Sequence, residues 1–375
     1  MKRKAVRLFL PACLGAWTLG GTAHAAGPGT TGAETLRFAA SPRSFAMAEA
    51  MTAVPDGPLS LFANPAALSS MQYQEFDLAY NRGIEDISHQ SIFYGRPARF
   101  GAVGLGVLRR DSGGLPGYDA SGLAVEQVSA EDWVLGAGLG KQILESGPWA
   151  LSLGAGAKAM DSRLEKARGG GYAADLGALA DLNLSWAKLS AGLAAQNLGP
   201  GIKYDRETTP LPAAYRLGLA ASRRIYGDSF TLSLDAARSR ADPGRLRIAV
   251  GFEGGVSGAL FPRIGFRTPD DLGNGLFFGL GLKVKSVRLD YGLALLGAFG
   301  PAHRFGLSFK WGEPIDISRT EENLRLSASH RDLGRQFMRR QRYLDAVHEF
   351  SQALNYDPTN RDLLYELKSA YDAMR

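Results

Sequence analysis

Apolar residues recur at every second position through most of the chain, from about residue 73 to residue 311. In residues 245–253, one face is apolar and the other is polar or small. The apolar positions are Leu246, Ile248, Val250 and Phe252, and the opposite face includes Arg245, Arg247 and Glu253. A period of two residues is that of a β-strand with one apolar and one wet face. This pattern predicts an all-β domain of long antiparallel strands.

About fourteen segments of roughly ten residues share the pattern, and Gly, Pro, Asp or Ser separates them. They cover residues 73–81, 88–96, 99–109, 131–140, 149–160, 171–183, 184–196, 213–222, 229–238, 245–254, 258–268, 275–285, 287–296 and 302–311. Residues 115–129 form either a further strand or a long loop. Strands of soluble sheets usually have about 5 to 6 residues, whereas a tilted strand needs about 9 to 11 to cross a bilayer.

This length predicts an all-β transmembrane β-barrel of about 14 antiparallel strands, with lipid outside and a wet or plugged lumen. A soluble, exported sandwich or solenoid alternates in the same way and is the alternative. An even number of strands would place both chain termini in the periplasm. No stretch after the first 25 residues is predicted to be a membrane-spanning helix, because the longest uncharged run, residues 57–74, contains Pro58 and Pro65.

The first 25 residues have the three parts of a secretory signal peptide. Residues 1–7 are basic, residues 8–19 are apolar, and Ala23 and Ala25 mark a predicted cleavage site near Ala25. Residues 10–13 are less suited to be a lipoprotein box, because the apolar run before Cys13 is short. Cys13 is the only cysteine, so the mature chain is predicted to have no disulfide and no thiolate site.

The segment that ends the alternating region resembles the signal by which the outer-membrane assembly machinery recognises a closing strand. In residues 304–311 a polar residue is followed by Gly306, and then by Phe309 and Trp311 two positions apart. The aromatic residues suit the interfacial girdle of a barrel, and the glycine lets a strand bend. We therefore predict outer-membrane lipid and the assembly machinery as partners.

Two further segments resemble a known family. Before the first strand, Asn64-Pro65-Ala66-Ala67-Leu68 resembles the "NPAGL" segment that opens barrels of the FadL-type and PorV/PorQ families, with Ala67 where glycine is usual. The order of Gln196-Asn197-Leu198-Gly199, Pro210-Leu211-Pro212 and Arg216-Leu217-Gly218 resembles the PorV/PorQ family, as do residues 289–292 and 303–308. The resemblance covers about residues 36–311. It implies a Gram-negative outer-membrane barrel in which Asn64 and Pro65 belong to a plug inside or under the lumen.

The resemblance predicts location better than activity. Some PorV/PorQ relatives hold or shuttle secreted cargo proteins in type IX secretion systems, whereas FadL-type relatives admit hydrophobic compounds. We expect a non-enzymatic barrel that assists the export or surface anchoring of proteins; the alternative is a FadL-like channel for hydrophobic small molecules, and a third is a structural porin. A large apolar pocket beneath the plug would favour transport, and a polar, filled lumen would favour a scaffold.

The periodicity changes to that of helices after Trp311. One tetratricopeptide-like repeat is predicted from the spacing of small and aromatic residues and a terminal proline. Its packing residues are Leu333, Gly334, Phe337, Tyr343, Ala346, Phe350, Ala353 and Pro358. One repeat and a third helix bury little surface, so the tail would need a partner or would cap the barrel mouth. We place this tail in the periplasm, where its helical groove suits contact with secreted cargo or a periplasmic protein.

These features divide the chain into five parts. They are a signal peptide (1–25), an N-terminal plug (26–72), the barrel (73–311), a linker (312–326) and the tetratricopeptide-like tail (327–375).

Neither a catalytic site nor a cofactor is predicted. The five histidines, His24, His89, His303, His330 and His348, are scattered and lack ligand spacing, so no metal site is expected. Gly136-x-Gly138-x-Gly140-Lys141 lacks the spacing of a phosphate-binding loop. Asp175 and Asp181 are expected to face the lumen. The net charge of +6 falls to +2 without the four basic residues of the leader, so nothing in the charge predicts a nucleic acid partner.

Overall fold

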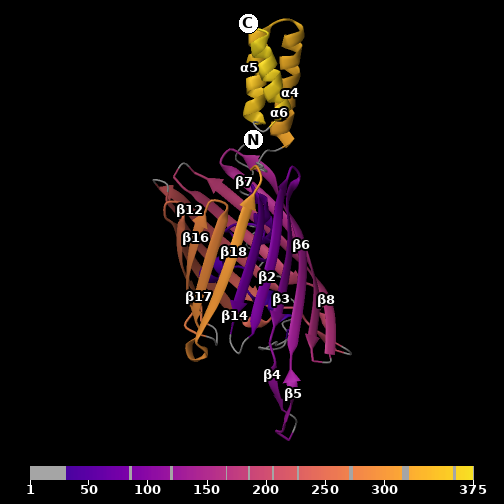
Figure 1. Ribbon diagram of the computed structural model, residues 1–375, viewed down its shortest axis with the longest axis vertical. Coiled ribbons are helices and arrows are strands. Elements are labelled where there is room, and N and C mark those ends of the chain that lie inside the picture. Colours follow the sequence, from indigo (N-terminus) through magenta and orange to yellow (C-terminus); the bar gives the residue numbers. More distant parts are fainter. Residues whose placement is uncertain are drawn as a thin grey trace.

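The structure is a computed structural model that describes residues 31–83, 87–118, 121–165, 167–184, 186–204, 207–225, 228–269, 273–314, 321–357 and 360–374. The predicted signal peptide lies outside these residues. In the described part of the chain, fourteen antiparallel strands form a closed barrel (Figure 1). They are β1 (Gln74–Arg82), β2 (Ser88–Ala98), β3 (Gly101–Asp111), β6 (Ala130–Ser146), β7 (Trp149–Leu164), β8 (Ala167–Asn183), β9 (Lys188–Leu198), β12 (Ala214–Ile225), β13 (Asp228–Ser239), β14 (Asp242–Gly255), β15 (Leu260–Arg267), β16 (Leu276–Val284), β17 (Val287–Leu295) and β18 (Pro301–Trp311). The predicted fold class is confirmed.

The barrel closes through the pairing of β8 with β9. The first and last strands pair along their whole length, from Gln74 opposite Trp311 to Arg82 opposite His303. The start of β1 and the end of β18 therefore lie at one end of the barrel, which we call the proximal end; the opposite end is the distal end.

Two short hairpins lie outside the fourteen strands. The sequence predicts either a further strand or a long loop for residues 115–129. These residues form the hairpin of β4 (Leu115–Tyr118) and β5 (Ala124–Val128), which projects beyond the distal end (Figure 1). β10 (Ile202–Tyr204) and β11 (Glu207–Thr209) form the second hairpin, which extends the sheet by pairing Lys203 with Gly170 of β8.

Every strand of the barrel exposes a large apolar side chain on its outer face. One example from each strand is Tyr80, Ile92, Leu105, Leu135, Leu153, Leu176, Leu193, Leu219, Leu232, Ile248, Ile264, Leu280, Leu289 and Phe305. Soluble monomers rarely expose apolar patches above a few hundred Å², whereas a transmembrane barrel has an apolar band around its outside. The outer face is therefore that of an outer-membrane β-barrel.

Residues 31–72 lie inside the barrel, and we call this segment the plug. It contains η1 (Glu34–Arg37), α2 (Pro42–Ala46), α3 (Ser60–Ala63) and η2 (Pro65–Ser70). The helix α2 begins where it does because Ser41 Oγ accepts hydrogen bonds from the N–H groups of Arg43 and Ser44, with proline at the first helical position. Four of the five clusters of buried apolar residues join plug and wall residues.

The plug crosses the lumen from end to end. At the distal end, the Gly32 N–H donates to the carbonyl oxygen of Pro210 at 2.9 Å. Towards the proximal end, Met71 lies against Gly95 of β2. The chain thus passes through the barrel before it begins the first strand.

Three helices follow the barrel: α4 (Glu321–Arg339), α5 (Tyr343–Tyr356) and α6 (Arg361–Asp372). In Figure 1 they form a bundle beyond the proximal end. Helix α4 begins six residues before the predicted boundary at residue 327. No helix of the described residues is both long and apolar enough to cross a membrane.

Removal of all residues after Trp311 is expected to leave a folded barrel. The buried apolar cluster of the tail consists of tail residues only, so the barrel wall keeps its own packing. The measurement is the heat-dependent shift of the barrel on a denaturing gel, made on the outer-membrane fraction. Loss of the truncated chain from that fraction would show instead that the tail is needed for assembly.

Candidate functional site: the plug, its wall and the two distal cavities

The motif Asn64-Pro65 lies at the centre of the plug and is fully enclosed. Asn64 Oδ1 accepts from the Ala66 N–H at 3.1 Å, and this caps η2, which begins at Pro65. The Asn64 Nδ2 donates to the carbonyl oxygens of Thr52 at 2.7 Å and Ala178 of β8 at 3.1 Å. One buried side chain therefore ends one turn of the plug, begins the next and fastens both to the wall.

Inward-facing glycines allow the plug backbone to touch the wall, and we call them the glycine ring. Its members are Gly95, Gly104, Gly136, Gly138, Gly140, Gly154, Gly177, Gly192, Gly218, Gly251, Gly265, Gly279, Gly292 and Gly306. A Cβ atom added to Gly251 would lie 2.8 Å from Met47 O, and one added to Gly265 would lie 2.7 Å from Ala46 O. Larger residues at these positions would push the plug away from the wall.

The motif Gln196-Asn197 ends β9 and binds the plug. Gln196 Nε2 donates to the carbonyl oxygens of Phe62 at 2.8 Å and Ala63 at 2.6 Å. Asn197 has a φ of 57°, a left-handed conformation that asparagine tolerates better than most residues. The strand therefore leaves the sheet at this point, and the β10–β11 hairpin continues the wall beside β8.

Asn197 is held by a buried lysine and carboxylate. Its N–H donates to Asp175 Oδ1 at 2.7 Å, and its side-chain oxygen accepts from Lys158 Nζ at 2.8 Å. Lys158 Nζ lies 2.6 Å from Asp175 Oδ2. Asp181, the other aspartate expected in the lumen, faces inward and lies 3.0 Å from Lys188 Nζ.

The proximal half of the lumen contains a buried cluster of charges, which we call the proximal ion cluster: Arg43, Asp56, Glu253, Arg263, Arg288 and Asp290. Arg43 of the plug binds Glu253 of β14 through two hydrogen bonds of 2.7 Å and lies 3.1 Å from Asp56. Arg263 of β15 lies 2.6 Å from Glu253 and 2.6 Å from Asp290. Burial disfavours the charged form of Arg43, but Glu253 and Asp56 outweigh it and hold its pKa well above the usual value.

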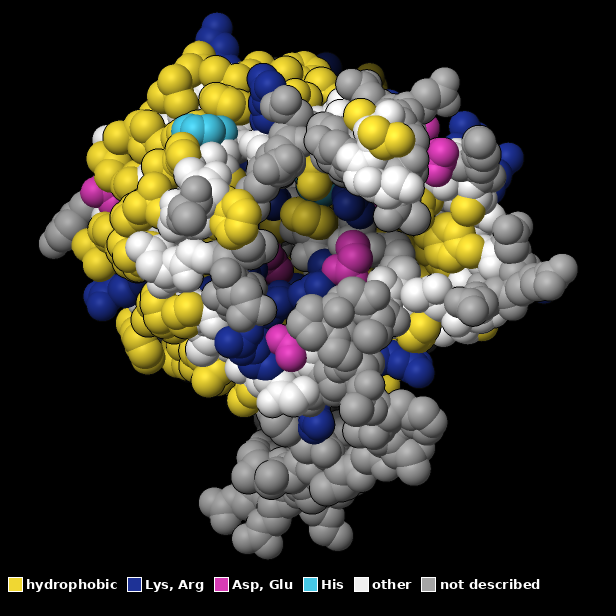
Figure 2. All heavy atoms as spheres, turned by 90° about the horizontal axis from the view of Figure 1, so that it is seen from below, with side chains coloured by type: hydrophobic (Ala, Val, Ile, Leu, Met, Phe, Trp, Pro, Cys, Tyr) yellow, Lys and Arg dark blue, Asp and Glu magenta, His cyan; other side chains and the backbone are white. Residues whose placement is uncertain are grey.

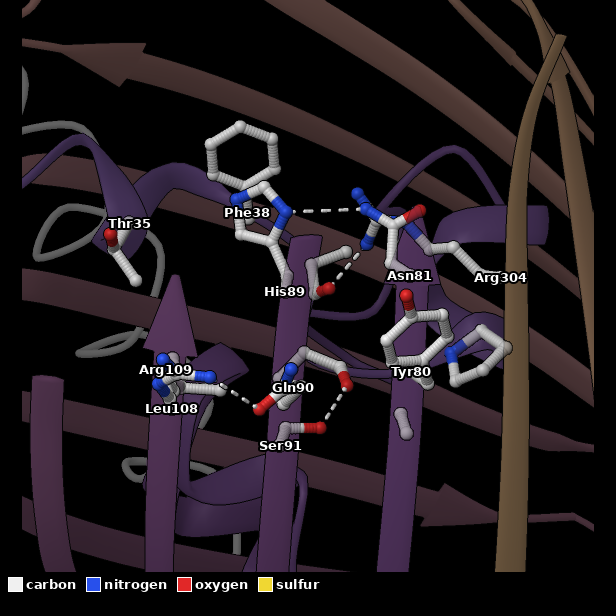
Figure 3. Close-up of a pocket in the computed structure, with 14 residues that line it drawn as sticks. Thr35, Phe38, Tyr80, Asn81, His89, Gln90, Ser91, Leu108, Arg109 and Arg304 are labelled. Carbon is white, nitrogen blue, oxygen red and sulfur yellow. Dashed lines mark hydrogen bonds between the residues drawn. The ribbon is translucent and has the colours of Figure 1, made fainter. Parts of the chain in front are cut away.

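An apolar pocket lies at the distal end, between the plug and strands β1, β2, β3 and β18 (Figure 3). Its empty space of about 350 Å³ includes space open to solvent, and more of its lining surface is apolar than polar. Phe38 packs against His89 with ring centroids 4.0 Å apart, and Leu108 and Ala79 are further apolar lining residues. The pairing of β1 with β2 is unbroken from Glu75 to Arg82, so the wall has no gap there.

A second cavity, which we call the cationic cleft, lies across the plug from the apolar pocket. It encloses about 670 Å³, including space open to solvent. Its charged lining residues are Arg37, Arg216, Arg245, Arg247, Arg267, Glu49, Asp235 and Asp242. Figure 2 views this end of the barrel, where basic and acidic side chains gather in the hollow of the mouth. Arginines outnumber acids in the lining by five to three.

The residues of the predicted assembly signal lie in β18, which closes the barrel against β1. Phe309 and Trp311 stack with centroids 5.4 Å apart, and Phe309 is exposed on the outer face. Gly306 faces inward, where an added Cβ would lie 2.8 Å from Pro42 Cγ of the plug. The glycine therefore has a local packing role, whatever part it has in assembly.

The predicted packing residues of the tail differ in burial. Ala346, Phe350 and Ala353 are buried in the core of the bundle, with Phe337 packed against them. Gly334 is needed because a Cβ there would lie 2.7 Å from the Phe350 ring. Tyr343 begins α5 and is half-buried. Leu333 is exposed instead of packed, and Pro358 lies outside the described residues.

Among the residues that the structure describes, no group of three or more His, Cys, Asp or Glu side chains is placed to hold a metal ion. Several charged groups of the lumen form ion pairs with each other or with the plug.

Neither a protein-family model nor a curated protein matches the sequence. Among solved structures, the chain is similar to the toluene transporter TodX of Pseudomonas putida, with 13% identity, a TM-score of 0.47 and coverage of 71% of this chain and 95% of that one. A FadL homologue of Pseudomonas aeruginosa gives 11% identity and a TM-score of 0.40 over 74% of this chain and 98% of that one. CdiB of Acinetobacter baumannii gives 11% identity and a TM-score of 0.38 over 64% of this chain and 60% of that one. These similarities concern the barrel fold alone.

Proposed function

We propose that the protein is a plug-gated outer-membrane channel for small hydrophobic compounds. The observation that carries this proposal is the apolar pocket at the distal end. Its mainly apolar lining suits a small hydrophobic molecule, since ligand sites are mostly apolar with a few polar groups. In an outer membrane with the tail in the periplasm, this pocket would face the cell exterior.

Passage beyond the pocket requires the plug to move. The plug touches the wall at the glycine ring, and the proximal ion cluster holds it through Arg43. A compound bound at the distal end could continue only if these contacts loosen. The proposal therefore predicts that fastening the plug to the wall stops transport.

A disulfide between plug and wall tests this prediction. A Cβ added to Gly104 of β3 would lie 3.7 Å from the Cβ of Leu61 in α3, within the usual range of about 3.5–4.5 Å for a disulfide. The added Cβ would also lie 3.1 Å from Leu68 Cδ2, so the Leu68 side chain needs to shift slightly. Because the only cysteine lies in the predicted leader, Leu61→Cys with Gly104→Cys would form the sole disulfide. We expect oxidised protein in liposomes to take up naphthalene at least about tenfold more slowly than reduced protein.

The two single variants are the controls, and their uptake should not respond to reduction. Equal uptake by the oxidised and the reduced double variant, with the disulfide confirmed by mass spectrometry, would contradict plug gating.

A second function, in the export or surface anchoring of proteins as in the PorV/PorQ family, is favoured by a different observation. The helical tail exposes large apolar side chains, Leu344, Leu364, Tyr365 and Tyr371, which suit contact with secreted cargo or a periplasmic protein. Mass spectrometry of what co-purifies from the native membrane in mild detergent separates the two functions. Stoichiometric secreted proteins that share a C-terminal domain would favour export. A stoichiometric hydrophobic compound without protein would favour uptake.

A further inference from the structure

The floor of the cationic cleft contains an unusual turn of the plug. Ala48 and Glu49 both have left-handed backbone conformations, with φ values of 54° and 67°. Such a conformation is unfavourable for a residue other than glycine, and strain of this kind often marks ligand clamps and switches. Ala48 is fully buried, and a Cβ at Gly265 would lie 2.5 Å from its nitrogen. The wall therefore holds the turn in place.

The turn directs the Glu49 carboxylate at the arginines of the cleft. Glu49 Oε1 lies 2.8 Å from Arg267 Nη1, and Glu49 Oε2 lies 3.9 Å from Arg216 Nη2. Burial disfavours the charged carboxylate, but the attraction of Arg267, Arg216, Arg247 and Arg304 outweighs it and lowers the pKa of Glu49. The carboxylate is thus an anion held by an excess of positive charge.

Arg216 has capacity for a further anion. Arg216 contacts Glu49 through the backbone, with Nη2 donating to its carbonyl oxygen at 2.9 Å, and its buried Nε atom has no hydrogen-bond partner. Asp235 forms an ion pair with Arg216 at 4.0 Å, and the same oxygen accepts hydrogen bonds from the Thr52 N–H at 3.0 Å and the Thr52 hydroxyl at 2.5 Å. An oxyanion of a solute would therefore meet, in Arg216, a guanidinium group that the protein's own acids leave incompletely satisfied.

We propose that the cationic cleft binds a solute that carries an oxyanion, either a carboxylate or a phosphate. The oxyanion replaces the carboxylate of Glu49 on Arg267 and Arg216, where the planar guanidinium groups suit such a partner. Glu49 is then an internal competitor, and its release frees the left-handed turn of the plug. Binding and release are exchange of ion pairs only, without a covalent step.

This inference does not depend on uptake of hydrophobic compounds, because the cleft and the apolar pocket are lined by different strands. Binding is measured on full-length protein in detergent, so a failure of transport leaves it standing. The probes are sodium benzoate and inorganic phosphate, with benzyl alcohol as the neutral match of benzoate.

Isothermal titration with the probes gives the first test. Arg267→Gln should weaken anion binding by about tenfold or more, whereas Glu49→Gln should tighten it by about tenfold because the competitor is removed. Glu49→Asp, which shortens the reach of the carboxylate, should tighten it less and serves if Glu49→Gln does not fold. Arg163→Gln is the matched control, since Arg163 lies in an exposed pair with Asp161 away from the cleft.

Thiol labelling gives the second test. The Ala50→Cys variant carries a thiol at a fully buried plug position, and we expect a maleimide to label it faster when the bound probe is present. Binding of benzoate or phosphate that Glu49→Gln tightens supports the proposal. Absence of binding by both probes, binding of benzyl alcohol equal to that of benzoate, or anion binding that Glu49→Gln and Glu49→Asp leave unchanged would overturn it.

Discussion

Replacement of Gly177 by leucine is expected to displace the plug and open the barrel. Gly177 faces inward on β8, and a Cβ there would collide with Asn64 Oδ1 and lie 3.1 Å from Pro65 Cδ. Asn64 would have to move, which breaks its buried hydrogen bonds to Thr52, Ala66 and Ala178. Overpacking costs about 1–3 kcal/mol and an unsatisfied buried group another 1–3 kcal/mol. If the plug stays in place, we expect the free energy of unfolding to fall by about 2–6 kcal/mol. If the plug is displaced, we expect a folded barrel that conducts ions.

Two measurements distinguish these results. Urea unfolding in detergent, followed by tryptophan fluorescence, reports the stability, and planar-bilayer recordings report the conductance. Gly254→Leu is the matched control, because Gly254 lies on the outer face of β14 and an added Cβ meets nothing closer than Pro262 Cγ at 3.7 Å. An unchanged unfolding midpoint together with a closed channel in Gly177→Leu would mean that the plug does not depend on the glycine ring.

The strands could be predicted from the sequence because their pattern is local. Leu246 and Ile248 face lipid for the same reason that they alternate with Arg245 and Arg247: successive side chains of a strand point to opposite faces. All fourteen predicted segments became barrel strands. β6 runs several residues further than expected at the proximal end and β7 at the distal end, because the strand pairing continues where the apolar alternation has already stopped.

The plug interface could not be predicted, because its partners are distant in sequence. Alternation places Glu253 on the wet face, but its partner Arg43 is separated by 210 residues. The glycine ring gives a sequence signal, since many inward positions of the strands are glycine. Nothing in a single sequence shows which part of the chain occupies the space that those glycines leave. The motif at Asn64 and Pro65 suggested a turn in a plug, and the structure adds its contacts with β8.

The tail shows the same division between local and distant information. Helical spacing placed Ala346 and Phe350 on a common face, and both are buried. Leu333 lies on the same helix as Gly334, yet it is exposed. The spacing of apolar residues defines a face, but burial of that face depends on the number of helices present to cover it.

Replacement of Arg263 by methionine is expected to lower the free energy of unfolding by about 3–5 kcal/mol. The reason is that two buried carboxylates, those of Glu253 and Asp290, each lose an ion-pair partner. The Arg263 side chain has no exposed surface, and it lies 2.6 Å from both Glu253 and Asp290. After its removal, Glu253 still has its ion pair with Arg43, and Asp290 still has its ion pair with Arg288. Each carboxylate has lost one of its two arginine partners. Both carboxylates then remain in a closed space with less positive charge than before.

The same urea unfolding assay gives the stability of this variant. Arg163→Met removes an arginine that lies 3.3 Å from Asp161 but is half exposed, and it should cost at most about 1 kcal/mol. Addition of Asp290→Asn to Arg263→Met should recover part of the loss, because it removes one of the two uncompensated charges. A single variant as stable as the parent would show that water reaches the proximal ion cluster. In that case the seal between plug and wall would rest on the glycine ring alone, and the plug would be easier to displace than the ion pairs imply.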